Sequence, residues 1–172
     1  MCQEYEDRRQ YPRAANEWRR ALADFGPGVN GSRQQRLDQI VKNWGQFEGG
    51  RVQPAGVGAT LEYRFRNGRQ VAFDAREIKV AELLKQVKDY LKSRPGQLDW
   101  QKLNVGDIGY RLVIENQDSL LGRSVANWTL DLDPKPNHVD DEVTVTTPLQ
   151  KAGAYLVTAT MQDGNVSRII VW

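Results

Sequence analysis

The sequence is poor in the residues on which most enzymatic and metal-binding chemistry depends. Of its 172 residues one is a cysteine, Cys2, so no disulfide can form within the chain. One is a histidine, His138, in the turn-rich stretch 134–138. We expect it to be a solvated loop residue rather than the base of an acyl-transfer triad. The sequence also lacks a zinc-ligand spacing, a phosphate-binding loop, a nucleophile elbow and a dinucleotide fingerprint. We therefore expect no catalytic, cofactor-binding or metal-binding residues and no enzymatic activity.

The sequence also lacks a strong charge of one sign and any long apolar run. Its 24 basic and 22 acidic side chains give a formal net charge of +2, so no strong field exists to attract nucleic acid. No apolar run approaches the roughly 20 residues needed to span a bilayer. We expect neither a nucleic-acid partner nor direct membrane insertion. The first residues have no signal-peptide core, so any export signal of a parent protein would lie outside this piece.

The apolar residues of the first segment, 1–48, recur at helical spacing. Residues 1–10 resemble the end of a helix with Tyr5 facing inward. Pro12 suits the first turn of the next helix, which should end at 26–28. Its predicted inward face consists of Ala15, Trp18, Leu22 and Phe25. Ser32 is the predicted N-cap of a further helix. The buried stripe of that helix should consist of Leu37, Ile40, Val41 and Trp44.

After residue 48, the spacing of the apolar residues changes from one typical of helices to one typical of strands. Residues 49–58 contain four glycines and a proline, which predicts a linker or domain boundary. Beyond it, alternating apolar residues on either side of Asn67-Gly68 predict a tight hairpin. A helix should follow over about 79–93 and end at Pro95-Gly96. Its predicted inward residues are Val80, Leu83, Leu84, Val87 and Leu91.

Further alternating segments complete a set of about seven predicted strands. These segments span 109–115, 124–132, 142–147, 155–161 and 167–172. Short strands interrupted by one helix predict an α+β chain. In it, the N-terminal helical segment is followed, over residues 59–172, by an immunoglobulin-like antiparallel β-sandwich with one inserted helix. A parallel α/β sheet fits less well, because its strands would be apolar on both faces.

The C-terminal residues 148–172 predict a β-hairpin and then stop within an apolar strand. Asp163-Gly164 supplies the tight turn, and Ile169-Ile170-Val171-Trp172 ends the sequence. A terminal apolar strand ordinarily has a neighbour and a continuation. We expect the chain to be an excised piece, truncated at its C-terminus.

Three groups of side chains invite a functional interpretation, and each has a simpler explanation. The carboxylates of the 131–142 region suggest a calcium site, but their spacing matches no standard loop, so we interpret the region as a solvated connection. Arg64, Arg66 and Arg69 suggest an anion site, but alternate polar residues are expected on a half-exposed strand. The lysines of the 79–93 helix form a stripe, which we interpret as an ordinary solvated face with no specific partner. Four tryptophans are expected in the core, namely Trp18, Trp44, Trp100 and Trp128. Trp172 is expected to be exposed.

Two segments carry a resemblance to known families. Residues 5–18, with Leu22 and Phe25 beyond, resemble one truncated tetratricopeptide repeat. Residues 149–157, with their Leu-Xaa-Xaa-Xaa-Gly-Xaa-Tyr pattern, and the strand 167–172 resemble the N-terminal macroglobulin-type sandwich of large bacterial alpha-2-macroglobulin-like proteins. This second resemblance covers about the last 115 residues, and in that family helical repeats can precede the sandwich domains.

The resemblance implies a non-catalytic scaffold or interaction fragment of a protein of protease inhibition or surface defence. Members of the family trap proteases, many through a thioester between cysteine and glutamine. Here Tyr5 stands three residues after Cys2, where the motif requires glutamine. The implied partners are other domains of the parent protein and proteases, and the implied location is periplasmic or at the cell surface. The alternative is a freestanding carbohydrate- or peptide-binding sandwich, with peptide favoured by an open edge strand and sugar by exposed aromatic residues on a sheet face.

Overall fold

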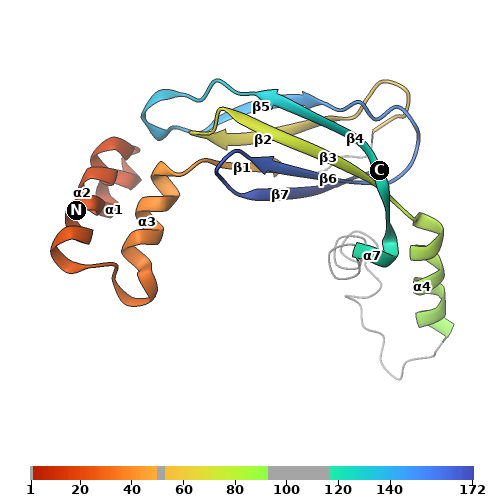
Figure 1. Ribbon diagram of the computed structural model, residues 1–172, viewed down its shortest axis with the longest axis horizontal. Coiled ribbons are helices and arrows are strands. Elements are labelled where there is room, and N and C mark those ends of the chain that lie inside the picture. The colour runs from red at the N-terminus through yellow and green to blue at the C-terminus, as the bar shows by residue number, and fades with distance from the viewer. Residues whose placement is uncertain (1, 50–52, 93–116) are drawn as a thin grey trace.

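The computed structural model describes residues 2–49, 53–92 and 117–172, and places helices at both ends of a two-layered β-structure (Figure 1). The helices of one end are α1 (Cys2–Asp7), α2 (Tyr11–Phe25) and α3 (Ser32–Val41), with a 3-10 turn η1 (Val29–Gly31) before α3. At the other end lie α4 (Val80–Lys92) and α7 (Gln117–Leu120). The strands are β1 (Trp44–Glu48), β2 (Thr60–Arg66), β3 (Gln70–Ile78), β4 (Leu121–Asp131), β5 (Asp141–Thr146), β6 (Tyr155–Met161) and β7 (Val166–Val171), with a second 3-10 turn η2 (Pro136–His138) before β5.

The strands form two antiparallel sheets that enclose one core. One sheet has the order β1-β2-β5 and the other β4-β3-β6-β7. On β2, buried and exposed residues alternate, with Leu61, Tyr63 and Phe65 facing inward, as expected for strands with one solvated face. Phe73 of β3 meets the ring of Tyr63 edge-on at 5.8 Å and stacks on Trp128 of β4 at 5.0 Å. The predicted α+β class with antiparallel sheets is confirmed, whereas the immunoglobulin-like assignment stays a prediction.

The predicted C-terminal hairpin is confirmed. β6 and β7 pair antiparallel from Tyr155 opposite Val171 to Thr160 opposite Val166. Asp163, in the turn between them, has a φ of 50°, a left-handed conformation that aspartate tolerates. β7 lies at the edge of its sheet, next to β1 of the other sheet (Figure 1).

The predicted hairpin around Asn67-Gly68 is wrong. β2 and β3 face each other from different sheets, so the connection is a corner rather than a hairpin. Each strand has two other partners, β1 and β5 for β2 and β4 and β6 for β3. A Cβ added at Gly68 would overlap Met161 of β6, so the corner packs tightly against the opposite strand. Alternation and an Asn-Gly dipeptide predict a reversal, but not whether the two strands share a sheet.

The boundary between helices and strands also differs from the prediction. α3 ends at Val41, and Trp44, predicted on its buried stripe, begins β1. β1 pairs with β2 from Trp44 opposite Arg66 to Glu48 opposite Glu62. Residues 49–58, predicted as an interdomain linker, therefore connect two strands of one sheet. Strand pairing has overridden a helical spacing that Trp44 happens to satisfy.

The helical end has its own small core. Its buried residues are Ala14 and Ala15 of α2 and Leu37 and Ile40 of α3, and the partly buried residues packed against them include Tyr5, Trp18 and Leu22. The prediction for Phe25 is wrong, because this last residue of α2 is 71% exposed, with the Arg33 guanidinium 5.8 Å above its ring. The N-cap of α3 is Gly31 rather than Ser32, since the left-handed φ of 71° at this position favours glycine.

The predicted inserted helix is confirmed as α4, which follows β3 and precedes β4 in the chain. Leu83 is buried as predicted, but Leu84 is 48% exposed. The predicted strand 109–115 and Trp100 lie outside the described residues. The later strands 124–132 and 142–147 correspond to β4 and β5. In the part of the chain that the structure describes, no helix has the length and apolar character to cross a membrane.

Candidate functional site

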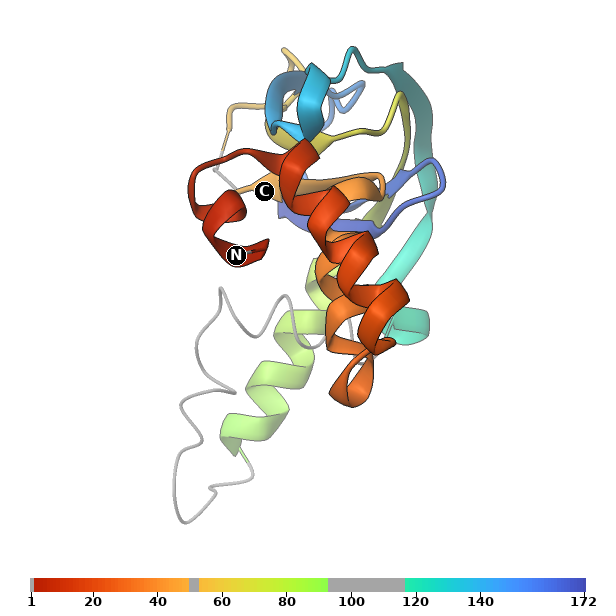
Figure 2. The same cartoon turned by 90° about the vertical axis from the view of Figure 1, so that its left-hand side faces the viewer.

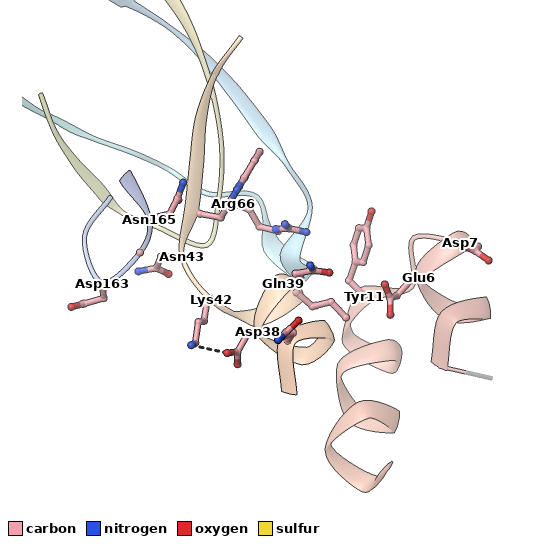
Figure 3. Close-up of a pocket in the computed structure, with 14 residues that line it drawn as sticks. Glu6, Asp7, Tyr11, Asp38, Gln39, Lys42, Asn43, Arg66, Asp163 and Asn165 are labelled. Carbon is pink, nitrogen blue, oxygen red and sulfur yellow. Dashed lines mark ion pairs between the residues drawn. The ribbon is translucent and has the colours of Figure 1, made fainter. Parts of the chain in front are cut away.

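A cleft of about 990 Å³ lies where the helices meet the sandwich (Figure 3). Its helical wall includes Glu6 and Asp7 of the α1 region, Tyr11 of α2 and Asp38 of α3. The sandwich contributes Trp44, Arg66 and the β6–β7 turn at 163–165. Figure 2 views the molecule from the helical end, with α1 and α2 in front of the strands. The cleft is thus formed by segments distant in the sequence, brought together by the packing of two substructures.

Asn67 fastens the end of α3 to the sandwich. Its Nδ2 donates to the carbonyl oxygens of Ile40 and Lys42, each at 2.9 Å. Its Oδ1 lies 2.8 Å from Nδ1 of His138 in η2. The last carbonyls of a helix have no intrahelical partner and require one from elsewhere. One amide therefore satisfies the Ile40 and Lys42 carbonyls at the C-terminal end of α3 and links them to a loop of the sandwich.

A second set of amides holds the other side of the junction. Asn43 donates from Nδ2 to the carbonyl oxygen of Gln162 at 2.8 Å. Asn165 accepts from the backbone N–H of Gly45 and donates to its carbonyl oxygen, both at 2.8 Å. A Cβ at Gly164 would lie 2.6 Å from the carbonyl oxygen of Asn43. The β6–β7 turn and the start of β1 therefore approach as closely as glycine permits.

The cleft carries several carboxylates, and they differ in how they are paired. Asp38 forms an ion pair with Lys42 at 2.7 Å and accepts from Gln34. Hydrogen bonds from Lys42 and then Gln34 hold the pKa of Asp38 below its usual range. Glu6 lies 3.9 Å from Arg36 and accepts from the indole of Trp18. The labelled carboxylates of Asp7 and Asp163 lie at opposite ends of the view in Figure 3.

Arg66 is the main cationic group on the sandwich side of the cleft. Its side chain is 16% exposed, its guanidinium lies 5.7 Å above the ring of Trp44, and its Nε lies 3.5 Å from Asp140. Nε is buried and has no hydrogen-bond partner. The indole ring and the carboxylate together compensate part of the desolvation of this charge. Trp44, predicted to be a core residue of a helix, instead supports an arginine at the cleft.

His138 is half-buried rather than solvated, which differs from the prediction. It bonds to Asn67 and lies near Arg19 and Arg66. Burial is the main cause that lowers the pKa of His138, and the positive charges of Arg19 and Arg66 lower it further. The imidazole is a junction residue between the helices and the sandwich.

Several of the other side chains singled out in the sequence have a local partner, whereas the lysines of α4 are exposed. Asp131 accepts from Gln70 at 2.9 Å, and Asp141 forms a 2.7 Å ion pair with Lys135. Hydrogen bonds from Lys135 and from the Glu142 backbone lower the pKa of Asp141. Arg64 pairs with Glu48 at 2.8 Å, while Lys85, Lys88 and Lys92 are exposed on α4. In residues 2–49, 53–92 and 117–172, no three histidine, cysteine or carboxylate side chains come close enough to hold a metal ion.

The sequence predictions missed the asparagines that build the junction. Asn43, Asn67 and Asn165 lie in short polar connections, where asparagine is common for its turn propensity alone. The sequence predicts a hairpin turn at Asn67 but gives none of the three a role at a junction. The partners of these amides lie 25 to 120 residues away in the sequence, so no local pattern identifies them.

Comparisons with known proteins give similarity to solved structures only. No family model matches the chain, and no curated protein matches it. A crystal structure of native alpha-2-macroglobulin from Escherichia coli spanning domains MG0-NIE-MG1 matches 76% of this chain at 17% identity and a TM-score of 0.43. A crystal structure of its domains NIE-MG1 matches 76% of this chain at 20% identity and a TM-score of 0.41. A cryo-EM reconstruction of the native E. coli protein matches 77% of this chain at 18% identity and a TM-score of 0.42. The chain spans 39%, 61% and 8% of those three chains, respectively.

Proposed function

We propose that the chain is a non-catalytic scaffold module of a larger exported protein of the alpha-2-macroglobulin-like kind. The observation that carries this proposal is the junction at Asn67, which binds both α3 and η2 and holds the helices in one orientation on the sandwich. Two of these hydrogen bonds are half-buried and one is exposed, and a fixed orientation of the helices suits a module that positions its neighbours. The resemblance of residues 149–157 to a macroglobulin-type strand supports the family assignment.

In this proposal the module acts through neighbouring domains of the parent protein, outside the cytoplasm, and the parent protein restrains proteases. The helices α1 and α2 would then correspond to one truncated tetratricopeptide-like repeat beside the sandwich. We expect no catalytic turnover from the module itself.

The test uses the protein translated from the complete reading frame. A trapped protease keeps an intact active site but is closed to large substrates. We therefore expect the complete protein to suppress cleavage of a large protein substrate while hydrolysis of a small chromogenic peptide continues. Unchanged cleavage of both substrates across a panel of proteases would contradict the protease-restraint role. The Asn67→Gly variant should weaken the effect if the orientation of the helices matters.

A second candidate is a peptide-binding module, which the cleft favours over a carbohydrate-binding one. The lining includes four carboxylates against two cationic groups, and Lys42 already pairs with Asp38. Such a lining favours a segment that carries lysine or arginine. A blocked tetrapeptide with one lysine and one arginine should bind in calorimetry more tightly than its glutamine analogue. Asp163→Asn should reduce that difference, whereas Asp24→Asn, at an exposed position of α2 outside the lining residues, should not. Equal heats for both peptides would rule this candidate out.

A further inference from the structure

Arg66, the last residue of β2, lines the cleft with a guanidinium that is incompletely paired. Its Nε lies 3.5 Å from Oδ1 of Asp140, which is too long for a strong hydrogen bond. Asp140 is not one of the residues that line the cleft. Of the three guanidinium nitrogens, Nε is the one that is buried without a partner. Within the described residues the two Nη atoms form no hydrogen bond either, and they remain accessible to solvent.

The indole of Trp44 holds this guanidinium in place. The guanidinium carbon lies 5.7 Å from the centre of the Trp44 ring, and most of the arginine side chain is buried. An arginine supported in this way has little conformational freedom left to lose when it binds a ligand. The planar fork of a guanidinium matches a carboxylate, which can accept two parallel hydrogen bonds from it. Nη1 and Nη2 of Arg66 are therefore two oriented donors at the wall of the cleft.

The helices contribute two further donors to the same cleft. Gln39 of α3 is exposed and Tyr11 of α2 is half-buried, and both line the cavity. Among the described residues, no hydrogen bond or ion pair engages either side chain. Figure 3 shows Arg66 reaching from the strands toward the helices, where Gln39 and Tyr11 stand. A side-chain amide and a phenol hydroxyl can each donate a hydrogen bond to an anion.

The local charge at Arg66 favours an anion, although the lining as a whole carries more carboxylates than cations. Burial and then the positive charges of Arg19 and Arg66 lower the pKa of the neighbouring His138, so the potential beside Arg66 is positive. Of the carboxylates that line the cleft, Asp38 is already paired with Lys42 at 2.7 Å. A ligand carboxylate at Arg66 would therefore meet a positive potential together with oriented donors.

We propose that the cleft binds the C-terminal end of a peptide, with the free α-carboxylate held by Nη1 and Nη2 of Arg66 and by further donors from Gln39 and Tyr11. This inference rests on the peptide-binding candidate for the same cleft and adds the end of the peptide that is bound. The acidic part of the lining selects a segment with lysine or arginine. In such a segment the C-terminus supplies a carboxylate without an acidic residue. A cleft of about 990 Å³ is at the upper end of the roughly 300–1,000 Å³ typical of ligand pockets.

An NMR titration of the 172-residue chain compares two forms of one peptide. The first is acetyl-Gly-Gly-Lys with a free carboxyl terminus, and the second is the same sequence with a C-terminal amide. The free acid should bind about tenfold more tightly, because it alone forms charge-assisted hydrogen bonds with the guanidinium. Arg66→Gln should abolish this difference, and its spectrum shows directly whether the variant is folded. The matched control is Arg64→Gln on the same strand, since Arg64 pairs with Glu48 outside the lining. It should keep the difference.

A second variant keeps the test independent of the folding of Arg66→Gln. Gln39→Leu changes an exposed side chain and should weaken binding of the free acid by roughly fivefold, with the affinity for the amide unchanged. Acetyl-Gly-Lys-Asp-amide tests a side-chain carboxylate as the ligand. It should bind no more tightly than its asparagine analogue, and tighter binding would overturn the assignment to the C-terminus.

Two results would overturn the proposal while the peptide-binding candidate still stands. One is equal affinity for the free acid and the amide, with lysine still preferred over glutamine in the same position. The other is a preference for the free acid that Arg66→Gln retains in full. Absence of spectral shifts with any of these peptides at millimolar concentration would overturn both the proposal and the peptide-binding candidate.

Discussion

The hydroxyl of Tyr63 lies against Gly45, so that a Cβ added at this glycine would overlap the phenol oxygen. Both residues are in the three-stranded sheet, Gly45 on β1 and Tyr63 on β2. Tyr63 is completely buried, and its hydroxyl has no hydrogen-bond partner. The absence of a side chain at Gly45 thus makes room for a phenol in the centre of the core.

Gly45→Ala should destabilise the protein, because the phenol of Tyr63 must move to admit the new methyl group. Overpacking of this kind costs about 1–3 kcal/mol of unfolding free energy, which urea denaturation would measure. The double variant Gly45→Ala with Tyr63→Phe removes the clashing oxygen and should recover part of the loss. Equal losses in the single and double variants would show that the two residues do not interact.

Tyr63→Phe alone should leave the protein as stable or stabilise it by up to about 1 kcal/mol, because a buried hydroxyl without a partner costs desolvation energy. The matched control is Tyr155→Phe, since the Tyr155 hydroxyl donates to the Lys151 carbonyl at 3.0 Å. That variant should lose about 1 kcal/mol. A loss in Tyr63→Phe as large as in the control would contradict the absence of a partner.

Alkaline unfolding should also depend on Tyr63. Burial raises the pKa of Tyr63 from 10.0 to about 12, because the ionised phenolate is disfavoured in the core. The unfolded chain then releases this proton more easily, so the contribution to stability is complete below pH 10 and is lost as the pH rises toward 12. The difference in unfolding free energy between Tyr63→Phe and the original chain should therefore widen in favour of the variant across this interval. A constant difference between pH 9 and pH 12 would refute the assignment.

Asn67→Gly should separate the helices from the sandwich. Glycine accepts the left-handed φ of 62° at this position without strain, so the variant removes only the amide and its bonds to Ile40, Lys42 and His138. We expect a loss of about 1–3 kcal/mol and faster amide exchange in α3 than in β3 and β6. The control variant is Asn16→Ala, on the exposed face of α2, because glycine inside a helix would itself be destabilising. This control should cause no such loss. Unchanged exchange in α3 would mean that apolar packing alone holds the junction.

The sequence predicts the strands better than it predicts their partners. Alternation of Leu61, Tyr63 and Phe65 identifies β2, because one face of that strand is solvated and the other is in the core. The same alternation cannot say that β3, a few residues later, lies in the opposite sheet. Trp44 satisfies both a helical spacing and a strand position, and only the pairing of β1 with β2 decides between them.

The cleft was not predictable for a related reason. Its walls come from α1, α2, α3, the start of β1, Arg66 at the end of β2 and the β6–β7 turn, which meet only in the folded chain. Asn67 illustrates the difficulty: its dipeptide with Gly68 predicts a tight hairpin turn, whereas the chain forms a corner between the two sheets there, and the amide bonds to carbonyls 25 and 27 residues earlier. Local signals report backbone conformation, whereas this site depends on tertiary contacts.

His138 should make the stability depend on pH near neutrality. Burial and then the charges of Arg19 and Arg66 lower its pKa in the folded protein below the ordinary value of 6.5. The unfolded chain therefore binds the proton more tightly, so the contribution of neutral His138 is complete above pH 6.5 and is lost as the pH falls below that value. His138→Gln retains an amide that can bond to Asn67 but does not titrate. Because the chain has one histidine, the difference in unfolding free energy between the original chain and this variant should be constant from pH 8 to 7 and shift against the original chain toward pH 5. Parallel curves over the whole range would show that His138 is not held in its neutral form by the junction.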